Sequence, residues 1–477
     1  MMKRKMSRST FLMGVGGAAA LASFRVSAGE AAQSGSRNVL WVVDDDHPQY
    51  MMGPMPVTRR KIRDSGIEFT VGSTDIPLCG PARVSLLTGL SVTTHKCDTN
   101  LTWPKYRDSP LGLQERTVAR YVKEAGYATG HFGKFVNRHW GQGSVPPHWD
   151  RWCETDSSGQ DTLISNEGNV DGTVVDLPDG LPPSVWAARR CADFVREHVS
   201  SPWFAQYCPS IPHFPYTPTA RSEHLYDGAR RRAPSVNEAD MSDKLKWMRD
   251  LPLANLDGVQ AEYEGKMEEL ADLDYYGMRP ILRALGQTGQ LANTVIFFTS
   301  DNGYLHGEHR MRRKDEPYWE SAEVPFFVKG PGVRSGATRK ALVNHTDLMP
   351  TTCEIAGVSP AVLDVDGRSM LTHLGADGFS GWRRRMLVSG SDDVGPRLNP
   401  GGSNDPSGRW WLLREGQEAF MLRENGAKEL YRMGTDPYQE RSKARTADPA
   451  LIERLTNFVK DMRAASGAAR RQLEEAP

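Results

Sequence analysis

The feature that most constrains the fold is an alternation of short apolar segments with helical patterns along the chain. Residues 39–43 form a continuous apolar run bounded by charge, and residues 294–299 are strongly apolar. Such runs are typical of strands buried on both faces of a parallel sheet. The pattern predicts an α/β fold in which helices sandwich a large, mostly parallel sheet. Further strands are predicted at 127–132, 203–207 and 324–328, and helices at 117–125, 185–199, 259–285 and 347–356.

The composition changes near residue 389, where Gly, Ser, Pro, Asn and Asp become frequent up to residue 409. This change indicates a loop. Beyond it we expect a small C-terminal α+β subdomain over residues 373–477, packed on a main domain over residues 29–372. Its predicted elements are three short antiparallel strands and a closing amphipathic helix, at 410–414, 419–423, 429–431 and 449–463.

Residues 1–28 have the pattern of an export signal. Cations between residues 3 and 8 precede a short apolar run at 11–24, and small residues at 26–28 predict cleavage after Ala28. The run is shorter than a comfortable membrane span, so no stable membrane insertion is expected. The segment before it is similar to a twin-arginine motif that lacks its second arginine. Export to the periplasm or the extracellular space is therefore expected, by a twin-arginine-like or a general secretory route.

Charge and cysteine content argue against two kinds of binding. The 59 Lys and Arg residues balance 59 Asp and Glu residues, so the formal net charge is zero. A nucleic-acid partner held by general electrostatics would need a basic surface, so none is expected. The six cysteines form no Cys-x-x-Cys pair, and a zinc site is not expected either.

Acidic residues follow two of the predicted strands at the point where each strand ends. Asp44, Asp45 and Asp46 come directly after the first apolar run, and Asp301 and Asn302 follow the second. Because the carboxyl ends of parallel strands meet at one edge of a sheet, these side chains can lie together in space. Oxygen ligands of this kind suit calcium or magnesium. The alternative is that these residues form turns or helix caps.

A short motif around Cys79 gives the most specific functional indication. Residues 79–83 read Cys-Gly-Pro-Ala-Arg, and Leu87-Thr88-Gly89 follow. A Cys-x-Pro-x-Arg core that leads into Leu-Thr-Gly resembles the signature of the type I sulfatase family. The alternative is a buried cysteine beside a proline turn.

The resemblance implies that Cys79 is oxidised after translation to formylglycine (3-oxoalanine) by a formylglycine-generating enzyme. The hydrated aldehyde is a geminal diol, which attacks sulfur with one hydroxyl and expels sulfate when the other hydroxyl loses its proton. A thiolate would instead leave a sulfur–sulfur adduct with no easy exit. The similarity runs from Asn38 to about Gly467 and implies an alkaline-phosphatase-like fold.

The same resemblance assigns metal ligands. Aligning from Asn38 places the aspartate pair of the family at Asp45 and Asp46, although the third aspartate leaves this register uncertain by one residue. Asp301 and Asn302 lie in a segment similar to the second metal segment of the family. A divalent cation there would bind a sulfate oxygen and offset charge in the transition state.

Four further residues match positions around the sulfate group in the family. Lys134 and Lys314 match lysines that contact the sulfate or the formylglycine, and Arg83 would hold the diol through its fixed set of donors. His213 falls on a histidine in a Pro-His context and would protonate the leaving group.

One departure from the family pattern concerns the substrate. Many members carry a histidine two residues after the lysine matched by Lys134, where this chain has Val136. The sequence Lys-Phe-Val-Asn at 134–137 instead resembles the branch related to glucosamine-6-sulfatases. Asn137 is therefore a candidate for a polar contact with substrate.

The leading hypothesis is an exported sulfatase that hydrolyses sulfate monoesters of a sulfated carbohydrate. A phosphonate or phosphodiester hydrolase on the same scaffold is the nearest alternative, because such enzymes can also use formylglycine. A third alternative is a non-catalytic, exported glycan-binding protein. The expected mark of the third is loss of Cys79, the lysines or the metal carboxylates, and all of these are present.

Overall fold

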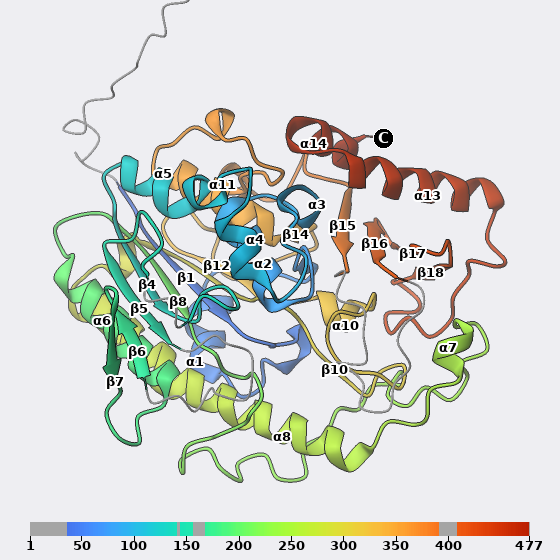
Figure 1. The fold of residues 1–477 in the computed structure, drawn as a ribbon, viewed down its shortest axis with the longest axis horizontal. Coiled ribbons are helices and arrows are strands. Elements are labelled where there is room, and N and C mark those ends of the chain that lie inside the picture. Colours follow the sequence, from blue (N-terminus) through green and yellow to red (C-terminus); the bar gives the residue numbers. More distant parts are fainter. Residues whose placement is uncertain (1–35, 141–143, 156–166, 391–407, 477) are drawn as a thin grey trace, which may run out of the picture.

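The computed structural model describes residues 36–140, 144–155, 167–390 and 408–476. Within these residues the chain forms a large sheet with helices on both faces and a smaller sheet near the C-terminus (Figure 1). The predicted export signal and most of the predicted loop at 389–409 lie outside the described residues.

The main sheet has ten strands in the order β13-β2-β12-β9-β1-β8-β4-β5-β6-β7. Its five central strands are parallel, as predicted, whereas its edges contain antiparallel pairs formed by β12 with β9 and β2, and by β6 with β5 and β7. All five strands predicted for the sheet belong to it. Its strands are β1 (Asn38–Asp44), β2 (Ile67–Phe69), β4 (Ala128–Gly133), β5 (Arg151–Thr155), β6 (Glu167–Val170), β7 (Thr173–Asp176), β8 (Trp203–Cys208), β9 (Thr294–Ser300), β12 (Phe326–Lys329) and β13 (Ala337–Arg339).

Both faces of β1 are buried, which explains its continuous apolar run. Leu40 and Val42 belong to an apolar cluster with residues of α6 (Pro183–Glu197) and α9 (Arg279–Gln287). The alternating residues Trp41 and Val43 belong to the opposite cluster. That cluster includes residues of α2 (Cys79–Thr88), α5 (Val118–Glu124) and α11 (Leu348–Ile355). Neighbouring strand residues therefore point into different layers.

The long helix predicted at 259–285 is continuous but not uniform. It begins as α8 (Leu256–Asp272), passes through a π-helical segment (Leu273–Met278) and ends as α9. No helix in the described part of the chain is long and apolar enough to cross a membrane. The shorter elements are α1 (Pro56–Thr58), α3 (Val92–His95), α4 (Thr102–Arg107), α7 (Lys246–Arg249), α10 (Trp319–Ala322), α12 (Leu371–Leu374), β3 (Gly72–Ser73), β10 (Leu305–His306), β11 (Arg312–Arg313) and β14 (Val343–Asn344).

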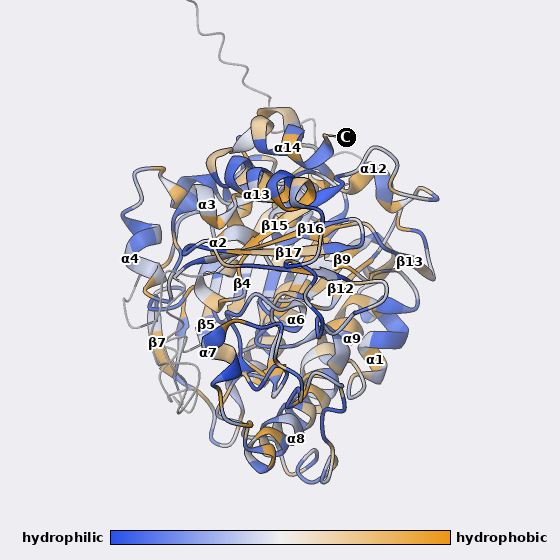
Figure 2. Ribbon diagram, turned by 90° about the vertical axis from the view of Figure 1, so that its right-hand side faces the viewer, coloured by the Kyte–Doolittle hydropathy of each residue, from blue (hydrophilic) through white to orange (hydrophobic). Residues whose placement is uncertain are grey.

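The C-terminal part forms a four-stranded antiparallel sheet in the order β15-β16-β17-β18. Helix α13 packs against one face of this sheet, and α14 follows beside it (Figure 1). Figure 2 shows β15 and β16 largely in the hydrophobic colour. The predicted α+β subdomain is confirmed, although β15 and α14 were not predicted. Its elements are β15 (Arg385–Ser389), β16 (Trp410–Glu415), β17 (Glu418–Arg423), β18 (Lys428–Arg432), α13 (Pro449–Ala464) and α14 (Gly467–Glu475).

The other face of the C-terminal sheet packs on the segment 315–319 of the main domain. Trp410 Nε1 donates a hydrogen bond to the Asp315 carbonyl at 3.2 Å, and Tyr318 Oη donates to Glu429 Oε2 at 2.9 Å. Tyr318 and Glu429 are buried. The segment that directly follows Lys314 is therefore held by the C-terminal sheet.

Candidate active site

The two acidic segments meet at the carboxyl edge of the main sheet. The Asp301 amide donates a hydrogen bond to the Asp44 carbonyl at 3.0 Å, so the turns after β1 and β9 begin side by side. Asp44 itself points elsewhere, because its Oδ2 lies 2.7 Å from His47 Nδ1. Asp45 and Asp46 are the two aspartates whose carboxylates face Cys79. Geometry thus distinguishes the three consecutive aspartates, which the sequence left uncertain by one residue.

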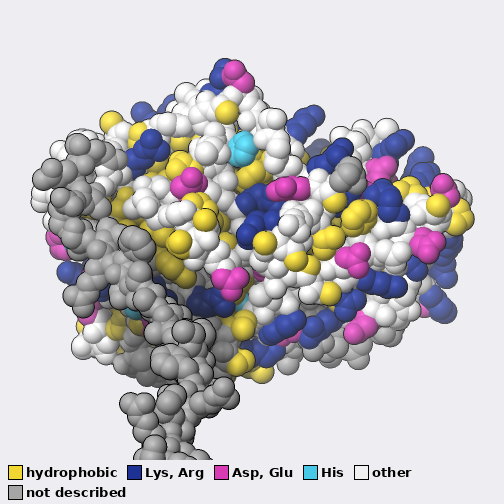
Figure 3. Space-filling model, turned by 90° about the horizontal axis from the view of Figure 1, so that it is seen from above, with side chains coloured by type: hydrophobic (Ala, Val, Ile, Leu, Met, Phe, Trp, Pro, Cys, Tyr) yellow, Lys and Arg dark blue, Asp and Glu magenta, His cyan; other side chains and the backbone are white. Residues whose placement is uncertain are grey.

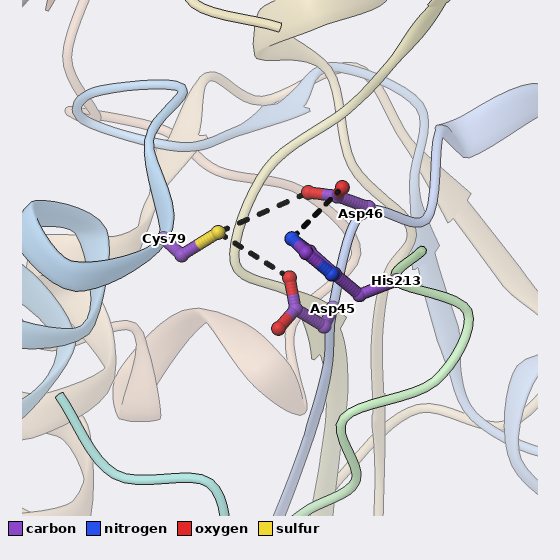
Figure 4. A group of neighbouring side chains, drawn as sticks. All are labelled: Asp45, Asp46, Cys79 and His213. Carbon is purple, nitrogen blue, oxygen red and sulfur yellow. Dashed lines mark hydrogen bonds and ion pairs between the residues drawn. The ribbon is translucent and has the colours of Figure 1, made fainter. Parts of the chain in front are cut away.

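Cys79 is the first residue of α2 and is almost completely buried. Its Sγ lies 3.4 Å from Asp45 Oδ1 and 3.9 Å from Asp46 Oδ1 (Figure 4). Lys314 Nζ lies 2.6 Å from the same sulfur atom. Burial, together with the nearby Asp301 and Asp45 carboxylates, raises the pKa of the Cys79 thiol well above its usual range. The thiol is therefore protonated at neutral pH and is not an activated nucleophile.

Three buried cations surround this cysteine and compensate the acidic cluster. Lys134, just after β4, forms an ion pair with Asp45, and Lys314 forms one with Asp46. Arg83 reaches across from α2, with its Nε and Nη2 each 2.9 Å from Asp301 Oδ2. Arg83 Nη1 also donates to the Lys134 carbonyl at 2.9 Å. These contacts link the ends of β1, β4 and β9 to the first two turns of α2.

The carboxylates differ in how readily they ionise. Burial alone would raise the pKa of Asp45, but Lys134, His213 and Lys314 together hold it well below the usual value. For Asp46, Lys314 and His213 overcome burial and lower the pKa to about 2. Burial and the Asp45 charge instead raise the pKa of Asp301 to about 6, although Arg83 opposes this. Asp45 and Asp46 are therefore anionic at neutral pH, as hard-cation ligands must be.

His213 lies in the loop after β8 and borders the cluster on its more open side. Its Nε2 faces Asp46 Oδ2 (Figure 4), 3.8 Å away, and its side chain is 22% exposed. The Phe214 carbonyl lies 2.5 Å from His213 Nδ1 and can only accept, so Nδ1 carries the proton. Burial lowers the pKa of His213 to about 4 even though Asp45 and Asp46 oppose the shift. Near neutral pH the unprotonated Nε2 therefore faces Asp46.

The donor set fits a hard divalent cation. The Asp45 and Asp46 carboxylates supply hard oxygen donors, and their ligand atoms lie within 4.8 Å of one another and of those of Cys79 and His213. Asn302 Oδ1 is buried without a hydrogen-bond partner, while its Nδ2 donates to Asp46 Oδ1 at 2.7 Å. The Asp301 carboxylate lies beside this group but is already bonded to Arg83 and, at 3.3 Å, to the Asp46 amide.

Asn137 follows Lys134 by three residues and lies against the first turn of α2. Its carbonyl accepts a hydrogen bond from the Trp103 amide at 3.0 Å, and its side chain approaches Gly80, the residue after Cys79. A Cβ added at Gly80 would lie 3.2 Å from the Cβ of Asn137. The Asn137 Oδ1 atom is buried and has no hydrogen-bond partner. The structure thus brings nine of the ten predicted residues into one cluster and places Asn137 beside Gly80, next to Cys79.

Lys266 is a site residue that sequence reasoning missed. It projects from α8, is completely buried, and donates to the carbonyls of Asp46 at 3.0 Å and Pro212 at 2.8 Å. Its Nζ also lies 3.9 Å from the centre of the Tyr304 ring. One ammonium group therefore connects the loop of Asp46 with the loop of His213. No local motif marks this lysine, because its partners are distant in sequence.

We expect Lys266→Met to destabilise the protein by about 2 kcal/mol or more, because two buried carbonyls lose their donor. Calorimetry should show a lower melting temperature together with a lower kcat. Lys246→Met is the matched control, since Lys246 is 79% exposed and should be nearly neutral. Equal effects of the two substitutions would show that Lys266 does not hold the two loops together.

The fold and the site together define an alkaline-phosphatase-like protein with a candidate metal centre beside a buried cysteine. Residues 37–358 match the model of the protein family Sulfatase. This match covers more than half of the sequence, and the chain belongs to the sulfatase family.

Curated relatives extend this finding. The extracellular sulfatase Sulf-1 homolog of Caenorhabditis elegans is 29% identical over 366 residues, which cover 70% of this chain and 48% of that protein. The N-acetylglucosamine-6-sulfatase of Capra hircus is 26% identical over 499 residues, covering 91% of this chain and 85% of that protein. The chain spans only 48% and 31% of the first two relatives, both extracellular sulfatase homologs.

Solved structures share the fold. A protein in complex with its substrate D-glucosamine-2-N,6-O-disulfate superposes with a TM-score of 0.74 over 90% of this chain and 98% of its own, at 19% identity. The phosphonate monoester hydrolase of Agrobacterium radiobacter superposes with a TM-score of 0.67 over 90% and 95%, also at 19% identity. At such identities the likeness establishes the architecture alone.

Proposed function

We propose that this protein hydrolyses sulfate monoesters of a sulfated carbohydrate. The observation that carries the proposal is the position of Cys79, in contact with Lys314 and facing the Asp45 and Asp46 carboxylates, in a chain of the sulfatase family. The site offers negative groups for a cation and positive groups for a sulfate within one buried cluster. That combination suits a sulfate ester, which must be bound as an anion and attacked at its sulfur atom.

We propose further that Cys79 is converted to formylglycine by a formylglycine-generating enzyme. The raised thiol pKa supports this, because an unmodified Cys79 is a poor nucleophile where it stands. The hydrated aldehyde supplies one hydroxyl for attack and a second whose deprotonation releases sulfate. The surroundings of Sγ suit such a group, since Asp45 and Asp46 accept hydrogen bonds and Lys314 donates one.

The proposed cation is calcium or magnesium, held by Asp45, Asp46, Asp301 and Asn302. When bound, it supplies positive charge to a sulfate oxygen. Arg83 keeps the Asp301 carboxylate oriented, with Nε 2.9 Å from Asp301 Oδ2. The cation ligands and Arg83 are thus already in position before the sulfate ester binds.

Three basic side chains complete the proposed site. Lys134 and Lys314 bind the sulfate oxygens as point charges, and both are buried, so their charges are weakly screened. His213 borders the cluster from the open side and is proposed to protonate the departing sugar oxygen. In the free protein this imidazole is neutral, and the negative charge of the incoming ester favours its protonated form.

The carbohydrate assignment is supported by the relatives and by the site. The Capra hircus relative is an N-acetylglucosamine-6-sulfatase, and the first structural neighbour has D-glucosamine-2-N,6-O-disulfate as its substrate. Asn137 remains a proposed polar contact for substrate, because its Oδ1 is buried without a hydrogen-bond partner close to Gly80, the residue after Cys79. We further propose that the protein is exported, in line with its predicted signal and its extracellular relatives.

The nearest alternative is a phosphonate or phosphodiester hydrolase, favoured by the structural likeness to the Agrobacterium radiobacter enzyme. The deciding experiment uses protein whose modification at Cys79 has been quantified by peptide mass spectrometry. We expect release of sulfate from sulfated glucosamines at a higher kcat/KM than product release from phenyl phosphonate or a phosphodiester. A reversed order of kcat/KM would replace the proposed function with the alternative. Binding of sulfated sugars with turnover of neither class would favour a non-catalytic glycan-binding protein.

The role of His213 predicts a dependence on the leaving group. Sugar alkoxides are poor leaving groups and need a proton in the transition state, whereas a nitrophenolate leaves readily without one. His213→Ala should therefore slow a sugar sulfate far more than nitrophenyl sulfate in steady-state kinetics. Lys314→Ala provides the comparison, because loss of a sulfate-binding charge should slow both substrates alike. Equal losses for His213→Ala would identify His213 as a positioning residue.

A further inference from the structure

A cavity of about 820 Å³ lies at the junction of the main domain and the C-terminal sheet. It is lined by residues 339–342 at the end of β13 and just after it, by Phe379 and residues 382–385 before and at the start of β15, by the turn between β16 and β17, and by Arg454 of α13. None of the residues of the candidate active site lines it. Figure 2 shows β13 on one side of the C-terminal sheet, with α13 above.

The walls of this cavity carry an excess of positive charge. Among the described residues that line it, six are Arg or Lys, and Glu415 is the one acidic residue. Glu415 is already shared by two of the cations, since Arg385 Nε lies 2.6 Å from Oε1 and Arg454 Nη2 lies 2.8 Å from Oε2. Arg383 forms ion pairs with Asp347 and Glu474.

The remaining three cations are Arg339, Lys340 and Arg384. Within the described residues, none of them forms an ion pair with a carboxylate. Arg339 donates to the carbonyls of Thr338 and Ala376 at 3.2 and 3.1 Å, and its Nε is buried without a hydrogen-bond partner. On the face drawn in Figure 3 acidic and basic side chains are interspersed, and the chain as a whole has no net charge. Uncompensated cations around one cavity are the arrangement that an anionic ligand stabilises.

The cavity also offers apolar surface and a definite position relative to the active site. Phe379, Trp382 and Leu342 contribute apolar lining, and the partly exposed ring of Phe379 is suited to the face of a sugar ring. β13 runs in the same direction as β1, so Arg339, its last residue, lies at the same edge of the sheet as Asp44. The two strands are four positions apart in the sheet order, which corresponds to roughly 19 Å across the sheet. A monosaccharide cannot reach across this distance, whereas an extended oligosaccharide can.

We propose that this cavity binds sulfate groups of a polymeric sulfated carbohydrate, at a position separate from the sulfate that reacts. The proposal rests on the proposed function for the nature of the polymer. Arg339, Lys340 and Arg384 provide the charge, and Phe379 provides contact with the sugar. The protein therefore prefers a long sulfated chain to a single sulfated sugar because the chain occupies both sites.

The test measures binding of a heparin dodecasaccharide to Cys79→Ala protein by calorimetry, so that turnover is absent. Combined Arg339→Ala, Lys340→Ala and Arg384→Ala should raise the Kd on the order of 10-fold, because each exposed ion pair contributes a few-fold. The matched control removes three exposed cations elsewhere, by Arg60→Ala, Lys61→Ala and Arg189→Ala, and should change the Kd little. Equal changes in the two triple variants would overturn the proposal.

Two further measurements separate this inference from the proposed function. In otherwise wild-type protein, the cavity substitutions should leave kcat/KM for a sulfated monosaccharide unchanged and lower kcat/KM for the dodecasaccharide. If wild-type protein hydrolyses no sulfate ester while the cavity variant still binds the dodecasaccharide more weakly than the control, the proposed function fails and the cavity site stands. If desulfated dodecasaccharide binds as tightly as the sulfated form, the cavity does not recognise sulfate and the inference is wrong.

Discussion

Cys79→Ser protein should lose nearly all turnover of sulfate esters, by roughly 10⁴-fold or more in kcat, while it keeps its fold. Serine provides a hydroxyl in the same place but lacks the second hydroxyl whose deprotonation releases sulfate. The substitution changes one buried atom among existing partners, so Lys314, Asp45 and Asp46 retain a group to contact. Steady-state kinetics on a sulfated glucosamine and on nitrophenyl sulfate, together with the melting temperature, check both parts.

Cys353→Ser is the matched control for Cys79→Ser. Cys353 is also a free, buried cysteine, but it lies in α11 beside Met349. The Cys353→Ser protein should lose some stability and keep the kcat of the wild-type protein. Wild-type kcat in protein that mass spectrometry shows to be entirely thiol at Cys79 would falsify the proposed role of formylglycine.

Exhaustive chelation should abolish turnover, and calcium or magnesium should restore it, because the ionised carboxylates at the end of β1 provide hard oxygen ligands. A readout independent of activity is the melting temperature of the chelated protein, which added cation should raise by binding the folded state. The affinity for the cation should fall as the pH drops through about 6, since Asp301 then takes up a proton. Full activity of protein shown to be metal-free would contradict the prediction.

Two neighbouring substitutions sharpen the metal experiment. Asp45→Asn removes a carboxylate that faces Cys79, and Asp44→Asn removes one that is bonded to His47 instead. We expect the first to weaken cation binding strongly and the second to leave the affinity nearly unchanged. The reverse result would move the metal ligand to Asp44.

The sequence was sufficient to predict the centre of the fold for a physical reason. Strands such as β1 and β9 are buried on both faces, and their apolar runs require this environment. The edges of the sheet were harder to predict. β6 has the sequence Glu-Gly-Asn-Val, and only two of its four residues are buried, so it lacks an apolar pattern. The direction of individual strands could not be predicted either. An isolated apolar segment such as β12 does not indicate whether it runs parallel or antiparallel to its neighbour in the sheet.

The residues of the candidate site were predictable where they lie within a short sequence motif or directly after a recognisable strand. Cys79 and Arg83 lie in one motif, and the acidic residues directly follow strands that could be recognised. Lys266 could not be found in this way, because its partner Asp46 is 220 positions distant in the chain. The orientation of Asp44 toward His47 likewise depends on backbone turns that three identical residues cannot distinguish. Contacts that determine geometry between segments need the folded structure.

The contact of the C-terminal sheet with residues 315–319 has an evolutionary consequence. From outside the main domain, Trp410 bonds the backbone carbonyl of Asp315, the residue after Lys314, and Glu429 bonds the side chain of Tyr318. Mutational drift in the C-terminal sheet can therefore shift the position of Lys314 beside Cys79 without altering any residue of the candidate active site. Relatives that diverge only in this sheet could acquire different rates or preferences while their motifs remain identical. Comparing motifs alone would miss that route to new specificity.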